Sequence, residues 1–286
     1  MKESRHRRHK GSARLTTIAY LTHYVATVQR MQMEHLHMRV VALSVRGLSK
    51  AFHSPSRANG MSVAALRDIS IEIHEGEIAG VVGRPGAGKT TLLLCLAGLL
   101  RPDAGSITWF GEHVTGHHVP PGLAYVPQRS GYYSFLTVRE ALEYYATLHD
   151  LSSANRAAQV ETAMREVSLH VHASRRVSSL SSSLLQRLGL AQSLIGAPRA
   201  ILLDETICGQ GLLFDRDIVS LLTRLTRRGV TIILAAPNPV ELHRITARVI
   251  NLVEGSVVAP SRYPLKNPSQ EPELAFDPLP RRVAEN

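Results

Sequence analysis

Apolar runs and helical stretches alternate along most of the chain. Three short runs, Ile78–Val82, residues 200–203 and residues 230–235, are almost wholly apolar. Runs of this length without a polar face are typical of buried parallel strands. Between them lie stretches of helical composition or spacing, such as residues 90–100 and 156–167. The pattern predicts an α/β fold in which strands and helices alternate.

A glycine-rich loop joins the first apolar run to the first helical stretch. Residues 83–90 are GRPGAGKT, which satisfies the pattern GxxxxGK[ST] in full. In this pattern, glycines let backbone N–H groups turn inward around phosphates, and the helix start adds its positive dipole end. Lys89 is expected to reach the β and γ oxygens of a nucleoside triphosphate, and Thr90 to offer a hydroxyl to Mg²⁺. The predicted ATP-binding residues here are Gly83, Arg84, Pro85, Gly86, Ala87, Gly88, Lys89, Thr90 and Thr91.

Two acidic residues, Asp204 and Glu205, directly follow the second apolar run. Asp204 is predicted to hold Mg²⁺ through water. Glu205 is placed to polarise the attacking water, which makes it the candidate catalytic residue. Together with the glycine-rich loop, these acids predict a P-loop nucleotide-binding core with ATP and Mg²⁺ as cofactors.

Composition excludes several classes of protein. With 44% hydrophobic and 20% charged residues, the 286-residue chain is neither wholly disordered nor collagen-like nor a polytopic membrane protein. No run reaches the roughly 18 apolar residues of a membrane-spanning helix. The two cysteines, Cys95 and Cys208, form no CxxC pair. This spacing excludes a disulfide framework or thiolate zinc site and favours the reducing cytosol.

The net charge of +10 alone would suggest nucleic acid or an anionic membrane as a partner. More than half of this excess lies in residues 1–39, whose run RHRRHK is typical of a solvated arm. Residues 1–38 are therefore predicted to be a basic, disordered extension, with a later translation start or an amphipathic arm on anionic lipid as alternatives. The proline-rich residues 262–286 are predicted to be a disordered tail. Residues 39–261 are predicted to form the folded domain.

The order of motifs resembles the ATP-binding subunit of ABC transporters over residues 40–258. The segment VRGLSKAF, ending at Phe52, is similar to the first strand of that family, where an aromatic ring stacks on adenine. A core phenylalanine is the alternative. The segment YVPQ, ending at Gln128, resembles the Q-loop, whose glutamine senses Mg²⁺ and the attacking water.

The resemblance also implies the rest of the fold and the partners. We expect a mostly parallel P-loop sheet flanked by helices, an antiparallel β subdomain and an inserted helical subdomain at about residues 130–195. In the family, the region that follows the Q-loop faces the coupling helix of an integral membrane permease. Thr137 and Glu140 form a possible capping box there. The family works as a dimer of ATP-binding subunits on the cytoplasmic face of the membrane. For this chain we expect a homodimer or, in preference, a heterodimer with a different ATP-binding subunit.

Three departures from the family pattern affect the expected chemistry. The signature LSGGQ appears as LSSSL, so that Ser181, Ser182 and Ser183 would face the partner's ATP without the two glycines. The added Cβ atoms restrict φ where the backbone must approach phosphate closely. Gly211 takes the place of the D-loop aspartate, and Pro237 that of the switch histidine. Proline has neither an imidazole nor an N–H to hold a γ-phosphate.

Three functional hypotheses follow from these residues. The leading one is the ATP-binding subunit of an ABC transporter, with weakened hydrolysis as an expectation; residues 136–151 look most like ABC-2-type exporters. The second is a non-hydrolysing regulatory subunit that binds ATP in a heterodimer with an intact subunit. The third, a nucleic-acid-associated ABC ATPase, fits the charge but not the architecture, because those proteins carry two phosphate loops or a long coiled coil. No specific nucleic acid partner is therefore expected.

Overall fold

The computed structural model describes residues 40–53, 62–116, 118–129, 131–149, 152–205, 216–237, 239, 242, 245–246 and 248–262. Side chains are described throughout these ranges except at positions 53 and 259–262. The extension predicted at residues 1–38, the predicted tail beyond residue 262, and Gly211 lie outside the described residues. The domain boundaries therefore stay a prediction.

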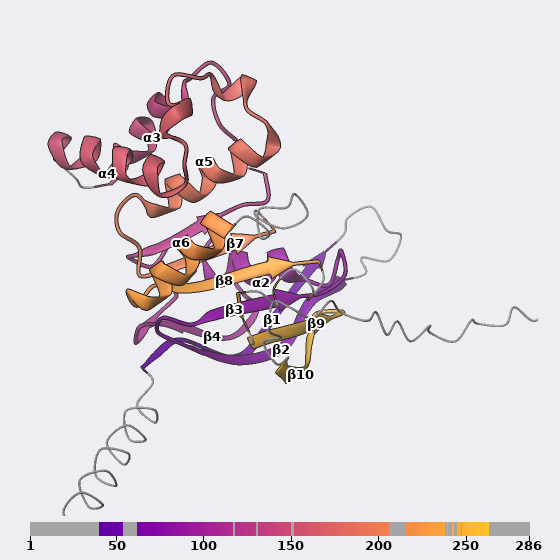
Figure 1. Ribbon diagram of the computed structural model, residues 1–286. Coiled ribbons are helices and arrows are strands. Elements are labelled where there is room, and N and C mark those ends of the chain that lie inside the picture. The colour runs from indigo at the N-terminus through magenta and orange to yellow at the C-terminus, as the bar shows by residue number, and fades with distance from the viewer. Residues whose placement is uncertain are drawn as a thin grey trace, which may run out of the picture.

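A six-stranded sheet forms the centre of the fold (Figure 1). Its strand order is β10-β9-β3-β8-β7-β6, and every neighbouring pair is parallel except β10 with β9. The strands are β3 (Ile78–Val82), β6 (Leu123–Val126), β7 (Ala200–Asp204), β8 (Thr231–Ala236), β9 (Arg248–Val253) and β10 (Ser256–Arg262). The apolar runs identified in the sequence are the central strands β3, β7 and β8.

The central strands are apolar throughout because both faces of the sheet are covered. All five residues of β7 and all six of β8 are buried. Alternate residues of β7 enter different cores: Leu202 lies in the cluster with β1, β2 and α2, whereas Ile201 and Leu203 lie in the cluster with the helices. Burial on both faces gives a continuous apolar run instead of an alternating one.

A four-stranded antiparallel sheet covers one face, with strand order β2-β1-β4-β5. Its strands are β1 (Val41–His53), β2 (Ser62–His74), β4 (Ala104–Trp109) and β5 (Glu112–His113). Helix α2 (Lys89–Leu96) contributes to the core between this sheet and the central one. The Trp109 indole donates a hydrogen bond to the Leu96 carbonyl over 2.8 Å, which ties the end of α2 to β4.

Helices cover the other face. The grouped helices α3 (Val138–Ala146), α4 (Ser153–Glu166) and α5 (Ser182–Leu194) stand at one side of the sheet in Figure 1, while α6 (Arg216–Arg227) lies along it. Two short 3₁₀ turns, His170–His172 and Val177–Ser179, precede α5. The capping box predicted at the start of α3 is present: Thr137 Oγ1 accepts from the Glu140 N–H, and the Glu140 carboxylate accepts from the Thr137 N–H.

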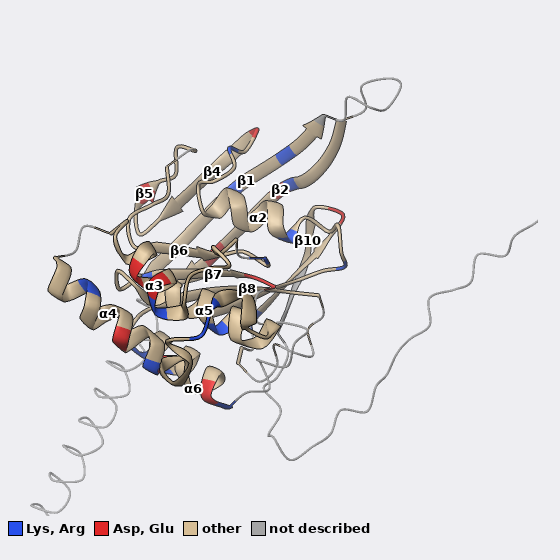
Figure 2. Cartoon of the chain, turned by 90° about the horizontal axis from the view of Figure 1, so that it is seen from above, with Lys and Arg blue, Asp and Glu red and all other residues tan. Residues whose placement is uncertain are grey.

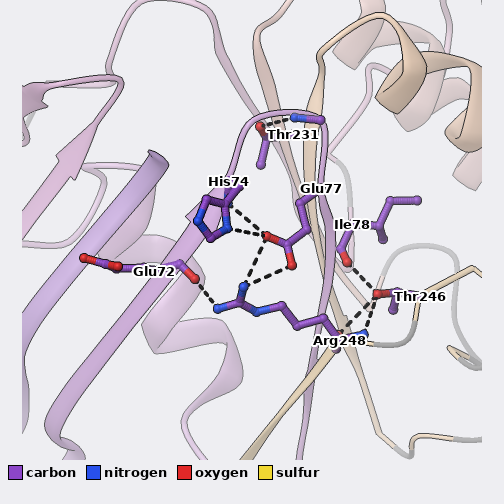
Figure 3. Close-up of polar contacts among 8 residues, drawn as sticks. Glu72, His74, Glu77, Ile78, Thr231, Thr246 and Arg248 are labelled. Carbon is purple, nitrogen blue, oxygen red and sulfur yellow. Dashed lines mark hydrogen bonds and ion pairs between the residues drawn. The ribbon is translucent and has the colours of Figure 1, made fainter. Parts of the chain in front are cut away.

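One polar cluster joins the two sheets at the start of β3 (Figure 3). The Glu77 carboxylate accepts from the His74 N–H at 2.9 Å and from Arg248 Nη1 at 3.0 Å. Arg248 Nη2 donates to the Glu72 carbonyl on β2. The cluster therefore links β2 of the antiparallel sheet to β3 and β9 of the central sheet through one carboxylate.

The architecture confirms the predicted fold class: a mostly parallel sheet with flanking helices, an antiparallel β subdomain and a group of inserted helices. Within the described ranges, none of the helices combines the length and the apolar character needed to cross a bilayer.

Candidate functional site

The carboxyl ends of four parallel strands bring the predicted site residues to one edge of the central sheet. The register pairs Val82 with Ala236, Asp204 with Ala235, and Val126 with Leu203, so the strands end close to level. The segments that leave these ends carry the glycine-rich loop, the two acids, Gln128 and Pro237. Ligands of open α/β sheets bind at this kind of edge.

Two glycines of the loop occupy positions that larger residues would disturb. Gly88, the residue before α2, has φ of +104°, and an added Cβ would lie 2.4 Å from the Ala65 carbonyl oxygen on β2. At Gly83, an added Cβ would lie 2.4 Å from the Leu252 carbonyl oxygen on β9. The loop is therefore held close to both sheets, and a side chain at either position would collide with a backbone carbonyl oxygen.

Lys89 lies at the start of α2 and is 5% exposed. Its ammonium donates to the Gly83 carbonyl at 2.6 Å and to the Arg84 carbonyl at 3.2 Å, so it bridges the loop from inside. The same ammonium lies 3.0 Å from Glu205 Oε1. These two carbonyl oxygens and the Glu205 carboxylate bind the Lys89 ammonium, which the pattern expects to bind phosphate oxygens.

Asp204 is the last residue of β7 and is 2% exposed. Its Oδ1 accepts from the Thr90 hydroxyl and its Oδ2 from the Tyr125 hydroxyl, each at 3.2 Å. Burial raises the pKa of Asp204, and the hydrogen bonds from Thr90 and Tyr125 oppose this rise. Burial also raises the pKa of Tyr125, with the Asp204 charge adding to it, so the phenol stays a hydrogen-bond donor.

Glu205 follows with φ of +50°, a conformation that is uncommon outside glycine. Its N–H donates to the Ala235 carbonyl on β8 at 3.2 Å. Its Oε2 accepts from Gln128 Nε2 at 3.0 Å, while Oε1 faces Lys89. The reversed backbone thus directs the carboxylate of Glu205 between the phosphate loop and the segment after β6.

The structure gathers Lys89, Thr90, Gln128, Asp204 and Glu205 through direct contacts. The three signature serines lie elsewhere, at the exposed start of α5. Ser181 is the residue before the helix and accepts from the Leu184 N–H at 3.4 Å, while Ser182 and Ser183 form its first turn. Among the described residues, no hydrogen bond or ion pair joins these serines to the phosphate loop of the same chain.

Two other predicted residues have clear positions. Pro237 directly follows β8 and is partly exposed, at the edge where the acids lie. Phe52 is 45% exposed on β1, so the core alternative was wrong. Phe52 pairs with Val63 on β2, two residues before the Ala65 carbonyl that approaches Gly88.

Tyr125 is the first residue of the segment YVPQ, but the sequence alone indicates no role for it in the site. The available signal was its position three residues before Gln128 on the strand that leads to the same edge. The sequence did not show that β6 lies beside β7, which is what places the Tyr125 hydroxyl on Asp204.

Comparisons with known proteins identify similar sequences and similar folds. The family model described as "ABC transporter" matches residues 66–208. The chain is 35% identical over 198 residues to a probable multidrug ABC transporter ATP-binding protein, YbhF of Escherichia coli K12, covering 68% of this chain but only 33% of that protein. It is 32% identical over 212 residues to the taurine import ATP-binding protein TauB of Jannaschia sp., covering 74% and 77% of the two chains.

Solved structures of the same kind share the fold. A dimeric bacterial ABC transporter cassette superposes with a TM-score of 0.67 at 22% identity, covering 79% of this chain and 99% of that one. The chain spans about a third of the length of YbhF, but most of TauB and nearly all of this cassette. With half of the chain matched by the family model and a relative matched over most of its length, this chain belongs to the ABC transporter family of ATP-binding proteins.

Proposed function

We propose that this chain is the ATP-binding subunit of an ABC transporter and binds ATP with Mg²⁺ at residues 83–91. The observation that carries the proposal is the direct contact of Lys89 with Glu205, beside that of Thr90 with Asp204, at the mouth of the glycine-rich loop. A cation, a hydroxyl and two carboxylates at a helix start form the arrangement that triphosphate hydrolysis requires. The exposed ring of Phe52 is proposed to stack on adenine.

The donor set fits Mg²⁺. The Thr90 hydroxyl and the Asp204 carboxylate are hard oxygen donors whose atoms lie 3.2 Å apart, and Gln128 supplies an amide from the neighbouring segment. Mg²⁺ typically takes only one or two protein oxygens and completes its shell with phosphate and water. Bound there, Mg²⁺ would neutralise phosphate charge. Lys89 would pair with phosphate oxygens, and the Glu205 carboxylate, once released by Lys89, would accept the hydrogen bond of the attacking water.

We further propose that hydrolysis is weakened. Pro237 stands directly after β8 without an imidazole to contact the γ-phosphate. In a dimer, the start of α5 would face the partner's ATP with the Ser181 hydroxyl intact, but the Cβ atoms of Ser182 and Ser183 would hinder the close approach of their backbone N–H groups to phosphate. These two losses favour, as the alternative, a non-hydrolysing regulatory subunit in a heterodimer with an intact ATP-binding subunit.

A cluster of aromatic side chains supports a protein partner. Tyr133, Phe135 and Tyr144 are 52%, 67% and 44% exposed. The Tyr133 ring is tilted against Phe135 and meets Tyr144 edge-to-face, with centroids 5.6 and 5.7 Å apart. Tyr133 and Phe135 lie between Gln128 and the start of α3, and Tyr144 lies near the end of that helix. Exposed aromatic patches of this kind mark interfaces. We assign it to an integral membrane permease, which would hold the chain at the cytoplasmic face of the membrane.

The direction of transport is proposed to be export, on the resemblance of residues 136–151 to ABC-2-type exporters. The named relatives include both a probable multidrug protein and a taurine import protein. Nucleic acid is not proposed as a partner. In Figure 2, helices α3, α4 and α6 each carry both basic and acidic residues, so they do not form one basic stripe.

ATP binding by the purified full chain tests the proposal. We expect Lys89→Ala to lower ATP affinity by about a hundredfold or more, because it removes the buried cation of the loop. Arg139→Ala, which breaks an exposed ion pair with Glu161, is the matched control and should bind ATP like wild type. Unchanged affinity in Lys89→Ala would contradict the assignment of the site.

A second measurement separates the two forms of the proposal. ATP turnover of wild type, alone and with its membrane partner, is compared with that of Glu205→Gln. Turnover above the Glu205→Gln level supports an ATPase; equal turnover with ATP binding retained supports the regulatory subunit.

A further inference from the structure

We propose that Tyr125 is a positioning residue for the Asp204 carboxylate and thereby sets how well the site takes up Mg²⁺. The proposal rests on the proposed ATP and Mg²⁺ site. It adds a residue to which the sequence motifs give no role. It is carried by the hydrogen bond from the Tyr125 hydroxyl to Asp204 Oδ2 and by the burial of that carboxylate.

The carboxylate of Asp204 is almost completely buried. A carboxylate that is 2% exposed has little water around it, so protein donors must fix its plane and stabilise its charge. Thr90 donates to one oxygen and Tyr125 to the other. Thr90 is itself a proposed Mg²⁺ ligand and would turn its oxygen to the ion. Tyr125 is not one of the proposed ligands, so its hydrogen bond can persist when the metal binds.

Strand pairing brings the Tyr125 hydroxyl to Asp204. It lies on β6, whose parallel register with β7 pairs Tyr125 with Leu202, two residues before Asp204. The length of the phenol ring spans this offset along the strands and brings the hydroxyl to the carboxylate. Since both partners are anchored in paired strands, their separation does not depend on a loop conformation.

The neighbouring acid, Glu205, is bound by a residue that follows the same strand. Gln128 leaves the same strand and donates to Glu205 Oε2 at 3.0 Å. The strand β6 and its exit thus hold both acids, Asp204 by Tyr125 and Glu205 by Gln128. A shift of this segment would therefore move both carboxylates together: that of Asp204, proposed to bind Mg²⁺, and that of Glu205, proposed to bind water.

The test uses Tyr125→Phe, which keeps the ring and removes only the hydroxyl. Binding of a fluorescent ATP analogue to the full chain is measured in EDTA and again as free Mg²⁺ is raised. We expect unchanged affinity in EDTA, where Lys89 and the loop suffice, and about a tenfold higher Mg²⁺ concentration for half-maximal enhancement of binding. Tyr132→Phe, which removes a hydroxyl that donates to Gln192 at 2.8 Å, is the control and should follow wild type.

Three results would overturn the inference. An unchanged Mg²⁺ requirement in Tyr125→Phe shows that the hydroxyl does not position the carboxylate. An equal loss of affinity with and without Mg²⁺ shows a general structural role instead. A melting temperature of Tyr125→Phe far below that of Tyr132→Phe, with wild-type Mg²⁺ dependence in the folded fraction, also shows a general structural role. If wild type itself binds no ATP, the proposed function fails first, which distinguishes the two failures.

Discussion

The ammonium of Lys89 lies 3.0 Å from Oε1 of Glu205, so the expected phosphate-binding cation and the candidate catalytic carboxylate pair with each other. Both groups are largely shielded from water, with side chains 4% and 23% exposed. This pair must separate before Lys89 can bind a phosphate and before Glu205 can hold a water molecule. ATP binding therefore competes with an internal ion pair.

Replacing the carboxylate should relieve this competition. In Glu205→Gln, Lys89 loses its anionic partner and the triphosphate loses a repelling charge. We expect ATP affinity to rise about fivefold, which corresponds to about 1 kcal/mol of electrostatic free energy, while turnover falls. Titration calorimetry without Mg²⁺ measures the first effect. Glu161→Gln breaks surface pairs with Arg139 and Arg165 and should leave affinity unchanged. Weaker binding in Glu205→Gln would show that the pair does not compete with ATP.

If Pro237 weakens hydrolysis as proposed, a histidine in its place should raise ATP turnover. Pro237→His adds an imidazole that can contact a γ-phosphate. Ser182→Gly with Ser183→Gly removes two Cβ atoms, so that the backbone N–H groups at the start of α5 can approach a phosphate more closely. We expect about a tenfold rise in ATP turnover from the triple variant and a smaller rise from Pro237→His alone. Pro239→His, two residues along, is the control. If the triple variant turns over ATP no faster than wild type, these substitutions do not limit hydrolysis.

The Cys95 thiol should be inert in the folded protein. It is fully buried on α2, and burial raises its pKa to about 11. In a Cys208→Ser background, we expect no reaction with a thiol reagent at pH 8 and full reaction in denaturant. Rapid labelling of the native variant would contradict the burial of α2.

The same thiol makes stability depend on alkaline pH. An unfolded cysteine loses its proton near pH 9, whereas the folded one keeps it to about pH 11. The unfolded state therefore binds fewer protons in this window, and the free energy of unfolding falls as pH rises through it. Urea denaturation at pH 8 and pH 10.5, with Cys95→Ala in the same background as the control, measures the difference. An equal fall in both proteins would assign it to other groups.

Sequence predicted the central strands well because burial on both faces leaves a continuous apolar run, as in β7 and β8. Helix ends were less predictable. The stretch predicted as helical at residues 90–100 forms α2 only to Leu96, because Gly98 turns the chain with φ of +70°. Helix α4 begins at Ser153, earlier than its apolar spacing indicates, since Ser152 caps it.

In the candidate site, too, some features follow from local sequence patterns and others depend on which strands are neighbours. Its loop and acids follow local patterns, so Lys89 and Asp204 could be named from the sequence. The hydrogen bond from Tyr125 to Asp204 joins residues 79 positions apart and depends on which strands are neighbours. The pairing of Lys89 with Glu205 likewise depends on how far the two strand ends reach, which no local pattern encodes.

The level ends of the parallel strands have an evolutionary consequence. The core is made inside the strands, and the chemistry is carried by the residues just beyond them. Pro237 stands one position past six buried residues of β8, so a change there would leave those six in place. Chains built this way can gain or lose catalytic power by single substitutions while keeping the same scaffold and the same nucleotide cradle.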